Sequence, residues 1–310
     1  MISESPFKFL LIGCGTGGII GGAGTTGQEP DAIHSDENGA QPQGDNMDYR
    51  NYRELAIARA GSILTVTMNR PERLNAIGGV LHEELSRIFQ DIAQDEATDV
   101  VILTGAGEAF SAGGDIDWLQ EVAETPEKFE QVAAEAKRII FGMLECDRPV
   151  IARVNGPATG LGATIALFCD IIVAADTAKI GDPHVRVGVV AGDGGAVIWP
   201  QLVGYARAKE YLMTGDLMTA AEAERIGLIN HVVAPADLDA KVNEIAGKLA
   251  RGATKAIRWT KMATNIGLKQ LAHSMMDASL AYESLSNRTA DHLEAVRAFR
   301  EKRKPVFTGR

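Results

Sequence analysis

The chain has 310 residues, of which 45% are hydrophobic and 23% charged, as is typical of a globular protein with a sizeable core. Its 41 acidic and 31 basic residues give a net charge of -10, which argues against general nucleic-acid binding. The three cysteines form no CxxC pair, which argues against a disulfide scaffold or a zinc site. No apolar run approaches the roughly 20 residues of a membrane helix, so we expect a cytoplasmic protein.

Residues 1–46 differ in composition from the rest of the chain. After residue 20 this segment is largely Gly, Gln, Asp, Asn and Pro, with little to bury. We therefore predict a disordered extension. Residues 13–18 match the GxGxxG pattern, but no helical periodicity follows, and a dinucleotide site needs a helix there. The sequence before Cys14 also resembles a lipoprotein cleavage box, although its leader has few basic residues and a short apolar stretch.

Regular patterns begin near residue 49. Residues 55–60 and 62–68 alternate like two strands that meet at Gly61. Further apolar runs predict buried strands at residues 99–103, 150–154 and 171–174. Helical spacing recurs at residues 81–92, 127–144, 240–249, 255–263, 271–285 and 291–302. These patterns predict an α/β core at residues 47–240 and a helical region at residues 241–310.

Three glycine-containing segments follow predicted strands. They are residues 110–117 (FSAGGDID), 154–162 (VNGPATGLG) and 182–195 (DPHVRVGVVAGDGG). Each alone would fit an ordinary turn. Together they indicate more, because glycine turns at strand ends with free backbone amides and a helix start can form an oxyanion hole.

In this order, the three segments resemble the crotonase (enoyl-CoA hydratase/isomerase) superfamily. Residues 69–76 (NRPERLNA) are similar to its N-terminal signature and residues 298–307 (AFREKRKPVF) to its ending, so the resemblance covers about residues 49–307. It implies a crotonase-like core of ββα turns and a C-terminal helical trimerisation region. The implied assembly is a homotrimer or homohexamer. The implied substrate is an acyl-CoA, with no metal and no cofactor besides the CoA of the substrate.

The resemblance also implies binding residues. The backbone amides of Gly114 and Leu161 stand at the positions of the two oxyanion donors, although relatives usually have glycine at the second position. Relatives often carry a lysine for the CoA phosphates after the first glycine segment, where this chain has Asp117 and Trp118. The positions that the resemblance implies for CoA binding are Arg70, Arg73, Ala112, Asp115, Ile116 and Lys302.

The catalytic positions depart from the family pattern. Hydratases of this family use two glutamates, since one carboxylate takes a proton from water while the other supplies a proton to carbon. This chain has Thr164 and His184 at those positions. We predict that His184 carries the proton transfer, because its reference pKa of about 6.5 lies near neutrality, whereas Thr164 can only orient water or substrate. A loop histidine bonded to Asp182 is the alternative. Asp193 is the other candidate acid, or else a turn or cap residue.

The predicted function is therefore that of an acyl-CoA enzyme which stabilises a thioester enolate with an atypical acid/base set. Isomerisation, atypical hydration, thioester cleavage and carbon–carbon cleavage all remain open. The alternative is a catalytically degenerate relative that binds acyl-CoA or assembles with active enzymes. RNA binding is a third reading, which the acidic charge disfavours.

We expect a homotrimer or homohexamer in solution. The helical region from residue 241 carries more apolar positions than one small layer can cover, so part of it should be buried between subunits. Light scattering should give the mass of three or six chains. A monomer at micromolar concentration would contradict this expectation.

Overall fold

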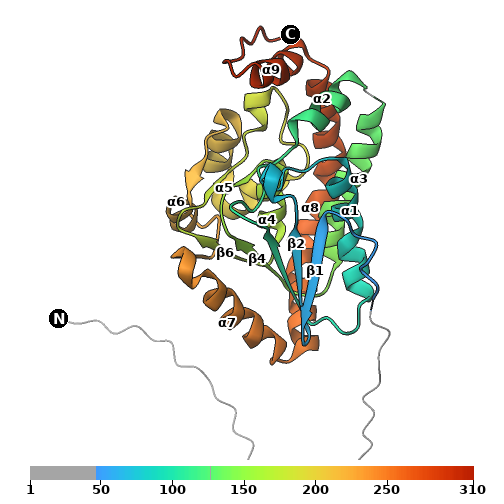
Figure 1. The fold of residues 1–310 in the computed structure, drawn as a ribbon, viewed down its shortest axis with the longest axis vertical. Coiled ribbons are helices and arrows are strands. Elements are labelled where there is room, and N and C mark those ends of the chain that lie inside the picture. Colours follow the sequence, from blue (N-terminus) through green and yellow to red (C-terminus); the bar gives the residue numbers. More distant parts are fainter. Residues whose placement is uncertain (1–46, 126) are drawn as a thin grey trace, which may run out of the picture. The chain divides into compact units, whose positions relative to one another are not determined.

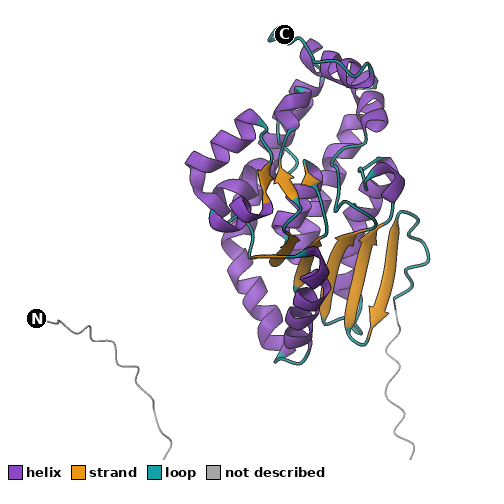
Figure 2. Ribbon diagram, turned by 60° about the vertical axis from the view of Figure 1, so that its left-hand side comes forward, coloured by secondary structure: helices purple, strands orange, loops and turns teal. Residues whose placement is uncertain are grey.

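A computed structural model describes residues 47–125 and 127–310. The predicted extension, with its GxGxxG match and Cys14, lies outside the described residues. A six-stranded sheet begins with the predicted hairpin of β1 (Leu55–Ala60) and β2 (Ile63–Met68), which turns at Gly61 with a φ of +60°. The other pairs of the sheet are parallel, and its order is β1-β2-β3-β4-β6-β9 (Figure 2). Its remaining strands are β3 (Val100–Gly105), β4 (Val150–Val154), β6 (Ile171–Ala175) and β9 (His231–Val233).

Helices cover both faces of this sheet. The helices α1 (Gly79–Gln94) and α3 (Lys128–Glu145) share one core with Val101 and Leu103 of β3. The alternate residues of the same strand, Val100 and Ile102, form a second core with α7 (Leu238–Ala250). Successive side chains of a strand point to opposite faces, so a strand covered on both sides is apolar throughout. The apolar run predicted as a buried strand therefore corresponds to β3.

A smaller sheet and four short or kinked helices surround this framework. The small sheet has the order β5-β7-β8. The helix α5 contains a non-helical residue, Gly204, four positions after Pro200. The elements concerned are β5 (Ala158–Thr159), β7 (Lys179–Gly181), β8 (Met218–Thr219), α2 (Ile116–Glu124), α4 (Leu161–Phe168), α5 (Gly195–Thr214) and α6 (Ala220–Arg225).

The C-terminal helices differ from the sequence pattern in one respect. Separate helices were predicted at residues 255–263 and 271–285, but α8 (Thr254–Asn287) is a single helix of 34 residues that packs along α3 and α5 (Figure 1). No proline interrupts residues 264–270, and the Thr264 hydroxyl bonds back to the Thr260 carbonyl within the helix. The gap in the apolar pattern at residues 264–270 therefore marks a change in what the helix packs against, and not the end of a helix. The chain closes with α9 (Ala290–Arg300).

Within the described part of the chain, no helix combines the length and the apolar character needed to span a membrane.

Glu84 fixes the entry into the sheet. Its buried carboxylate on α1 accepts hydrogen bonds from the backbone N–H groups of Arg53, Glu54 and Leu55, at 2.6, 2.9 and 3.0 Å. Replacing it would leave these donors without their acceptor. Hydrogen bonds to charged groups are among the stronger ones in proteins, so the start of β1 depends on this side chain.

We predict that Glu84→Ala lowers the free energy of unfolding by about 2–4 kcal/mol, because three backbone donors lose their partner. The measurement is urea denaturation. The matched control is Glu83→Ala, which removes a half-exposed carboxylate paired with Arg87 and should cost about 0.5 kcal/mol or less. Equal losses in the two variants would contradict the role given to Glu84.

Candidate active site

The three glycine segments meet at the carboxyl ends of the strands. Thr159 N–H donates to Ser111 at 3.0 Å and so joins the first two segments, and Ile77 N–H, just before α1, donates to Gly113 at 2.7 Å. Gly160 N–H donates to Gly181, the last residue of β7, at 3.1 Å. These bonds hold the turn after β3, the start of α4 and the segment after β7 side by side.

The two predicted oxyanion donors both line one cavity. Leu161 begins α4, and the first N–H groups of a helix have no intrahelical partner. Gly114 bridges to Ile77, but that bridge uses the Gly113 carbonyl and the Asp115 N–H instead. Among the described residues, neither Gly114 N–H nor Leu161 N–H has a hydrogen-bond partner. Two free amides beside one cavity suit the binding of a developing oxyanion.

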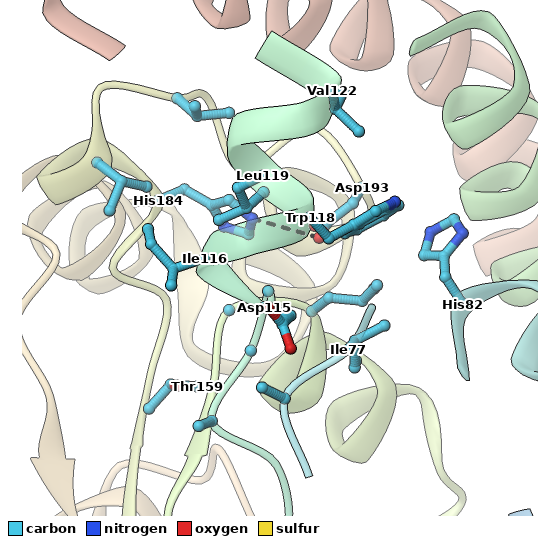
Figure 3. Close-up of a pocket in the computed structure, with 18 of the residues that line it drawn as sticks. Ile77, His82, Asp115, Ile116, Trp118, Leu119, Val122, Thr159, His184 and Asp193 are labelled. Carbon is cyan, nitrogen blue, oxygen red and sulfur yellow. Dashed lines mark ion pairs between the residues drawn. The ribbon is translucent and has the colours of Figure 1, made fainter. Parts of the chain in front are cut away.

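The cavity has a volume of about 580 Å³ and largely apolar walls (Figure 3). Arg73, Arg186 and Phe299 lie at its solvent-exposed end. Its apolar side chains come largely from α2 and α3, with Leu280 from α8, and include Ile77, Leu119, Val122, Phe129, Val132, Ala136 and Leu280. Besides the two arginines, five ionisable side chains interrupt these walls, namely His82, Asp115, His184, Asp193 and Glu283.

His184 lies between two carboxylates. Its Nδ1 contacts Oδ1 of Asp182, and its Nε2 lies 3.4 Å from Oδ2 of Asp193, the ion pair drawn in Figure 3. Burial lowers the pKa of the imidazole, but the charges of Asp182 and Asp193 outweigh burial and hold that pKa well above 6.5. His184 was expected to titrate near neutrality, but in this geometry its pKa lies higher. At neutral pH, His184 is a proton donor.

Asp193 is the complementary proton acceptor. Burial raises the pKa of its carboxyl, but the charge and hydrogen bond of His184, with a hydrogen bond from the Gly195 backbone, hold it below 3.8. Asp193 directly precedes the N-terminus of α5, where the helix dipole favours negative charge. Asp193 also lies in the turn before α5 and accepts a hydrogen bond from Gly195, as the turn or cap alternative predicts, and in addition it lines the cavity.

The same three side chains also have the spacing of a metal site. One ligand atom from each of Asp182, His184 and Asp193 lies within 4.8 Å of the others. A metal needs a free lone pair on the imidazole, however, and both ring nitrogens of protonated His184 are occupied as donors. The contacts of His184 with the two carboxylates are those of a protonated imidazole.

Glu283 of α8 completes this group, and no sequence motif pointed to it. Its Oε2 is shielded from solvent and has no hydrogen-bond partner among the described residues. A Cβ added at Gly192 would come within 2.8 Å of that oxygen, so only glycine lets α8 approach so closely. Burial and then the charge of Asp193 raise the pKa of Glu283 well above 4.5. The shift favours the neutral acid form of Glu283 beside the cavity.

Thr164 occupies a different place from the other predicted catalytic residues. It is fully buried in α4 and is not part of the cavity wall. Its hydroxyl has no partner among the described residues, and its methyl group packs beneath Gly194, where an added Cβ would lie 2.9 Å away. In this arrangement Thr164 does not face the cavity and does not contact a ligand there.

Some of the residues predicted for CoA binding line the cavity, and others do not. Arg73, together with Ala112, Asp115 and Ile116, lines the cavity. Arg70 instead forms ion pairs with Glu54 and Asp115, both at 3.2 Å, and lies outside the cavity wall. Lys302 is exposed and also outside the wall.

His82 and Glu135 form a further buried pair that sequence reasoning missed. His82 of α1 lines the cavity, and its Nδ1 lies 2.7 Å from Oε2 of Glu135 on α3. His82 follows Leu81 on the buried face of α1, which is the only sequence signal that could have drawn attention to it. Its partner lies 53 positions away, so the pairing itself depends on how the helices pack.

Comparisons with known proteins agree on one family. The model of the enoyl-CoA hydratase/isomerase family matches residues 58–310. A short-chain-enoyl-CoA hydratase of Clostridium acetobutylicum is 37% identical over 81% of this chain and 95% of its own. An enoyl-CoA hydratase/isomerase from Mycobacterium paratuberculosis has a TM-score of 0.76 and 37% identity over 79% of this chain and 97% of its own. A β-diketone hydrolase from the cyanobacterium Anabaena has a TM-score of 0.72 and 32% identity over 76% of this chain and 95% of its own. These structures confirm the predicted fold class.

We predict that Glu283→Gln raises the melting temperature more at about pH 8 than at about pH 4.5. A carboxyl whose pKa is raised on folding contributes stability below its unfolded pKa and loses it as pH rises toward the folded value. Glutamine keeps the shape but cannot ionise, so the variant escapes that loss. Calorimetry at the two pH values is the check, and an equal change at both would show that Glu283 is not a neutral acid.

Proposed function

The chain belongs to the enoyl-CoA hydratase/isomerase family, and we propose that it binds an acyl-CoA and stabilises the enolate of its thioester. The observation that carries this proposal is the pair of free amides, Gly114 and Leu161, on the cavity that His184 and Asp193 also face. A side chain added at Gly160, next to Leu161, would lie 3.6 Å from the His184 ring. The oxyanion site and the proton donor are thus neighbours.

In the proposed mechanism, the thioester oxygen accepts hydrogen bonds from Gly114 and Leu161. Asp193 takes a proton from the carbon next to the thioester, and the charge that develops on the oxygen is stabilised by the two amides. Protonated His184 then returns a proton to the substrate, while Asp182 holds its ring. A pair of glutamates likewise supplies one proton acceptor and one proton donor. Isomerisation needs no more than this; hydration needs a water in addition.

The CoA portion is proposed to leave through the exposed end of the cavity. Arg73 lies there with its guanidinium about half exposed, 3.5 Å from Asp117, which also binds Arg300 at 2.8 Å. A guanidinium suits phosphate binding, and an exposed ion pair costs little to rearrange. Arg70 is a weaker candidate, because its ion pairs with Glu54 and Asp115 would have to break.

Cleavage of a β-dicarbonyl substrate is a second candidate. Two observations favour it: the likeness to a β-diketone hydrolase, and a histidine held between carboxylates where hydratases carry a glutamate. Asp193 would take a proton from water as it adds to the distal carbonyl. The carbon–carbon bond then breaks, the electron pair leaves as the thioester enolate on Gly114 and Leu161, and His184 protonates its carbon. The products are a carboxylic acid and a shortened acyl-CoA.

A homotrimer or homohexamer is proposed for the assembly. Several large apolar side chains of α8 and α9 are solvent-exposed in the single chain; they include Trp259 at 67%, Ile266, Tyr282, Leu285 and Phe299. Large apolar side chains that are exposed in such numbers on two helices commonly mark a contact between subunits.

We predict that His184→Ala and Asp193→Asn each lower turnover of the best substrate in an acyl-CoA panel by about two to four orders of magnitude. Thr164→Ala should cost far less. The wild-type rate should fall on the acid side as Asp193 is protonated and on the alkaline side as His184 loses its proton, since the pKa of Asp193 is lowered and that of His184 raised.

The panel should contain enoyl-CoA and β-oxoacyl-CoA thioesters, so that it separates the two candidate reactions. Near-normal turnover by His184→Ala would refute the assignment. Binding of acyl-CoA without turnover of any member would identify the chain as a degenerate relative.

A further inference from the structure

His82 has a fixed orientation at the buried end of the cavity. Only 1% of the residue is exposed to solvent. Its Nδ1 bonds Oε2 of Glu135 at 2.7 Å, and the other oxygen of Glu135 accepts a hydrogen bond from Gln131 at 2.8 Å. The Trp118 ring packs against the imidazole, with 5.1 Å between the ring centroids. The ring is thus held by a hydrogen bond on one edge and an aromatic face beside it.

The Glu135 contact determines which nitrogen of His82 remains available. Burial raises the pKa of the Glu135 carboxyl, but the hydrogen bonds from His82 and Gln131 outweigh burial and lower it, so Glu135 is a carboxylate. A carboxylate only accepts hydrogen bonds, and Nδ1 must therefore carry a proton. Nε2 has no hydrogen-bond partner among the described residues.

Apart from Glu135 and Asp193, the surroundings of His82 are apolar. Phe129, Val132 and Ala136 of α3 line the same end of the cavity. A buried polar atom without a partner costs about 1–3 kcal/mol, and a hydrocarbon ligand would leave Nε2 unsatisfied. Figure 3 shows His82 across the cavity from His184, with Trp118 and Asp193 between them. A chain held at the amides of Gly114 and Leu161 would run from the exposed end toward this imidazole.

We propose that His82, oriented by Glu135, binds an oxygen on the acyl chain, so that the substrate is an oxo- or hydroxyacyl-CoA and not a plain hydrocarbon thioester. This inference rests on the proposed function, because it assumes that an acyl-CoA occupies the cavity. Neutral His82 accepts a hydrogen bond from a hydroxyl group at Nε2, and protonated His82 donates one to an oxo group. His82 determines specificity and takes no part in proton transfer at the thioester.

The test is calorimetric binding of saturated acyl-CoA ligands to the full chain. The ligands are hexanoyl-CoA and its hydroxy- and oxo-derivatives, with the oxygen moved along the chain. We expect one derivative to bind about ten- to hundredfold more tightly than hexanoyl-CoA. In His82→Phe, which keeps a ring, this ratio should fall close to one through weaker binding of the derivative.

Two further variants serve as controls. His82→Gln retains a hydrogen-bonding group and should keep part of the preference, and Glu83→Gln, one position along α1 and outside the cavity wall, should keep all of it. Should His82→Phe fail to fold, the nitrogen-15 resonance of Nε2 in the wild type decides, since it should shift with the preferred derivative and not with hexanoyl-CoA.

The outcomes separate this inference from the proposed function. If the wild type binds hexanoyl-CoA and every derivative equally well, or if the Nε2 resonance does not respond, His82 does not recognise an oxygen, and the proposed function stands. If no acyl-CoA binds at all, the proposed function itself fails.

Discussion

Charge balance among four neighbouring ionisable side chains is the constraint on which the site depends. His184, Asp193 and Glu283 line the cavity and Asp182 lies behind His184. Asp182 and Asp193 are buried and His184 and Glu283 are half-buried, so isolated charges would be costly there. The imidazolium offsets one of its two carboxylate neighbours. The charge that remains, together with burial, keeps Glu283 neutral. Proton positions in this group are therefore linked, and a change in one side chain alters the proton affinity of the others.

Glycines allow these groups to approach one another. A Cβ at Gly195 would lie 2.3 Å from Oδ2 of Asp182, and a Cβ at Gly192 would lie 2.4 Å from the Ser279 carbonyl of α8. Gly194, between them, has a φ of +125°, a conformation that other residues rarely adopt. The GDGG sequence at residues 192–195 therefore brings α5, α8 and the segment after β7 together around Asp193.

The cavity has two walls with different chemistry. In the proposed function, the wall formed by the glycine segments and the group around His184 offers amides, a proton donor and a proton acceptor to the thioester. The opposite wall, from α1, α2 and α3, is apolar except for His82, which Glu135 and Trp118 hold in place. Binding of an unsubstituted hydrocarbon chain requires only apolar surface at this wall. The buried His82–Glu135 pair is the feature that distinguishes this cavity from a simple hydrophobic one.

The short strands β5, β7, β8 and β9 were not predicted. The strands β1, β2, β3, β4 and β6, the order of the glycine segments and the replacement of the two expected glutamates by Thr164 and His184 could be read from the chain alone. These follow from local patterns: alternation along β1 and β2, an apolar run in β3, and glycine at strand ends. Tertiary structure alone decided that His82 meets Glu135, that Glu283 reaches Asp193 and that Thr164 lies away from the cavity. The partners in these contacts come from helices far apart in the chain, and their register is set by packing. The protonation of His184 was likewise not predictable, because it depends on two carboxylates whose distances only the folded chain defines.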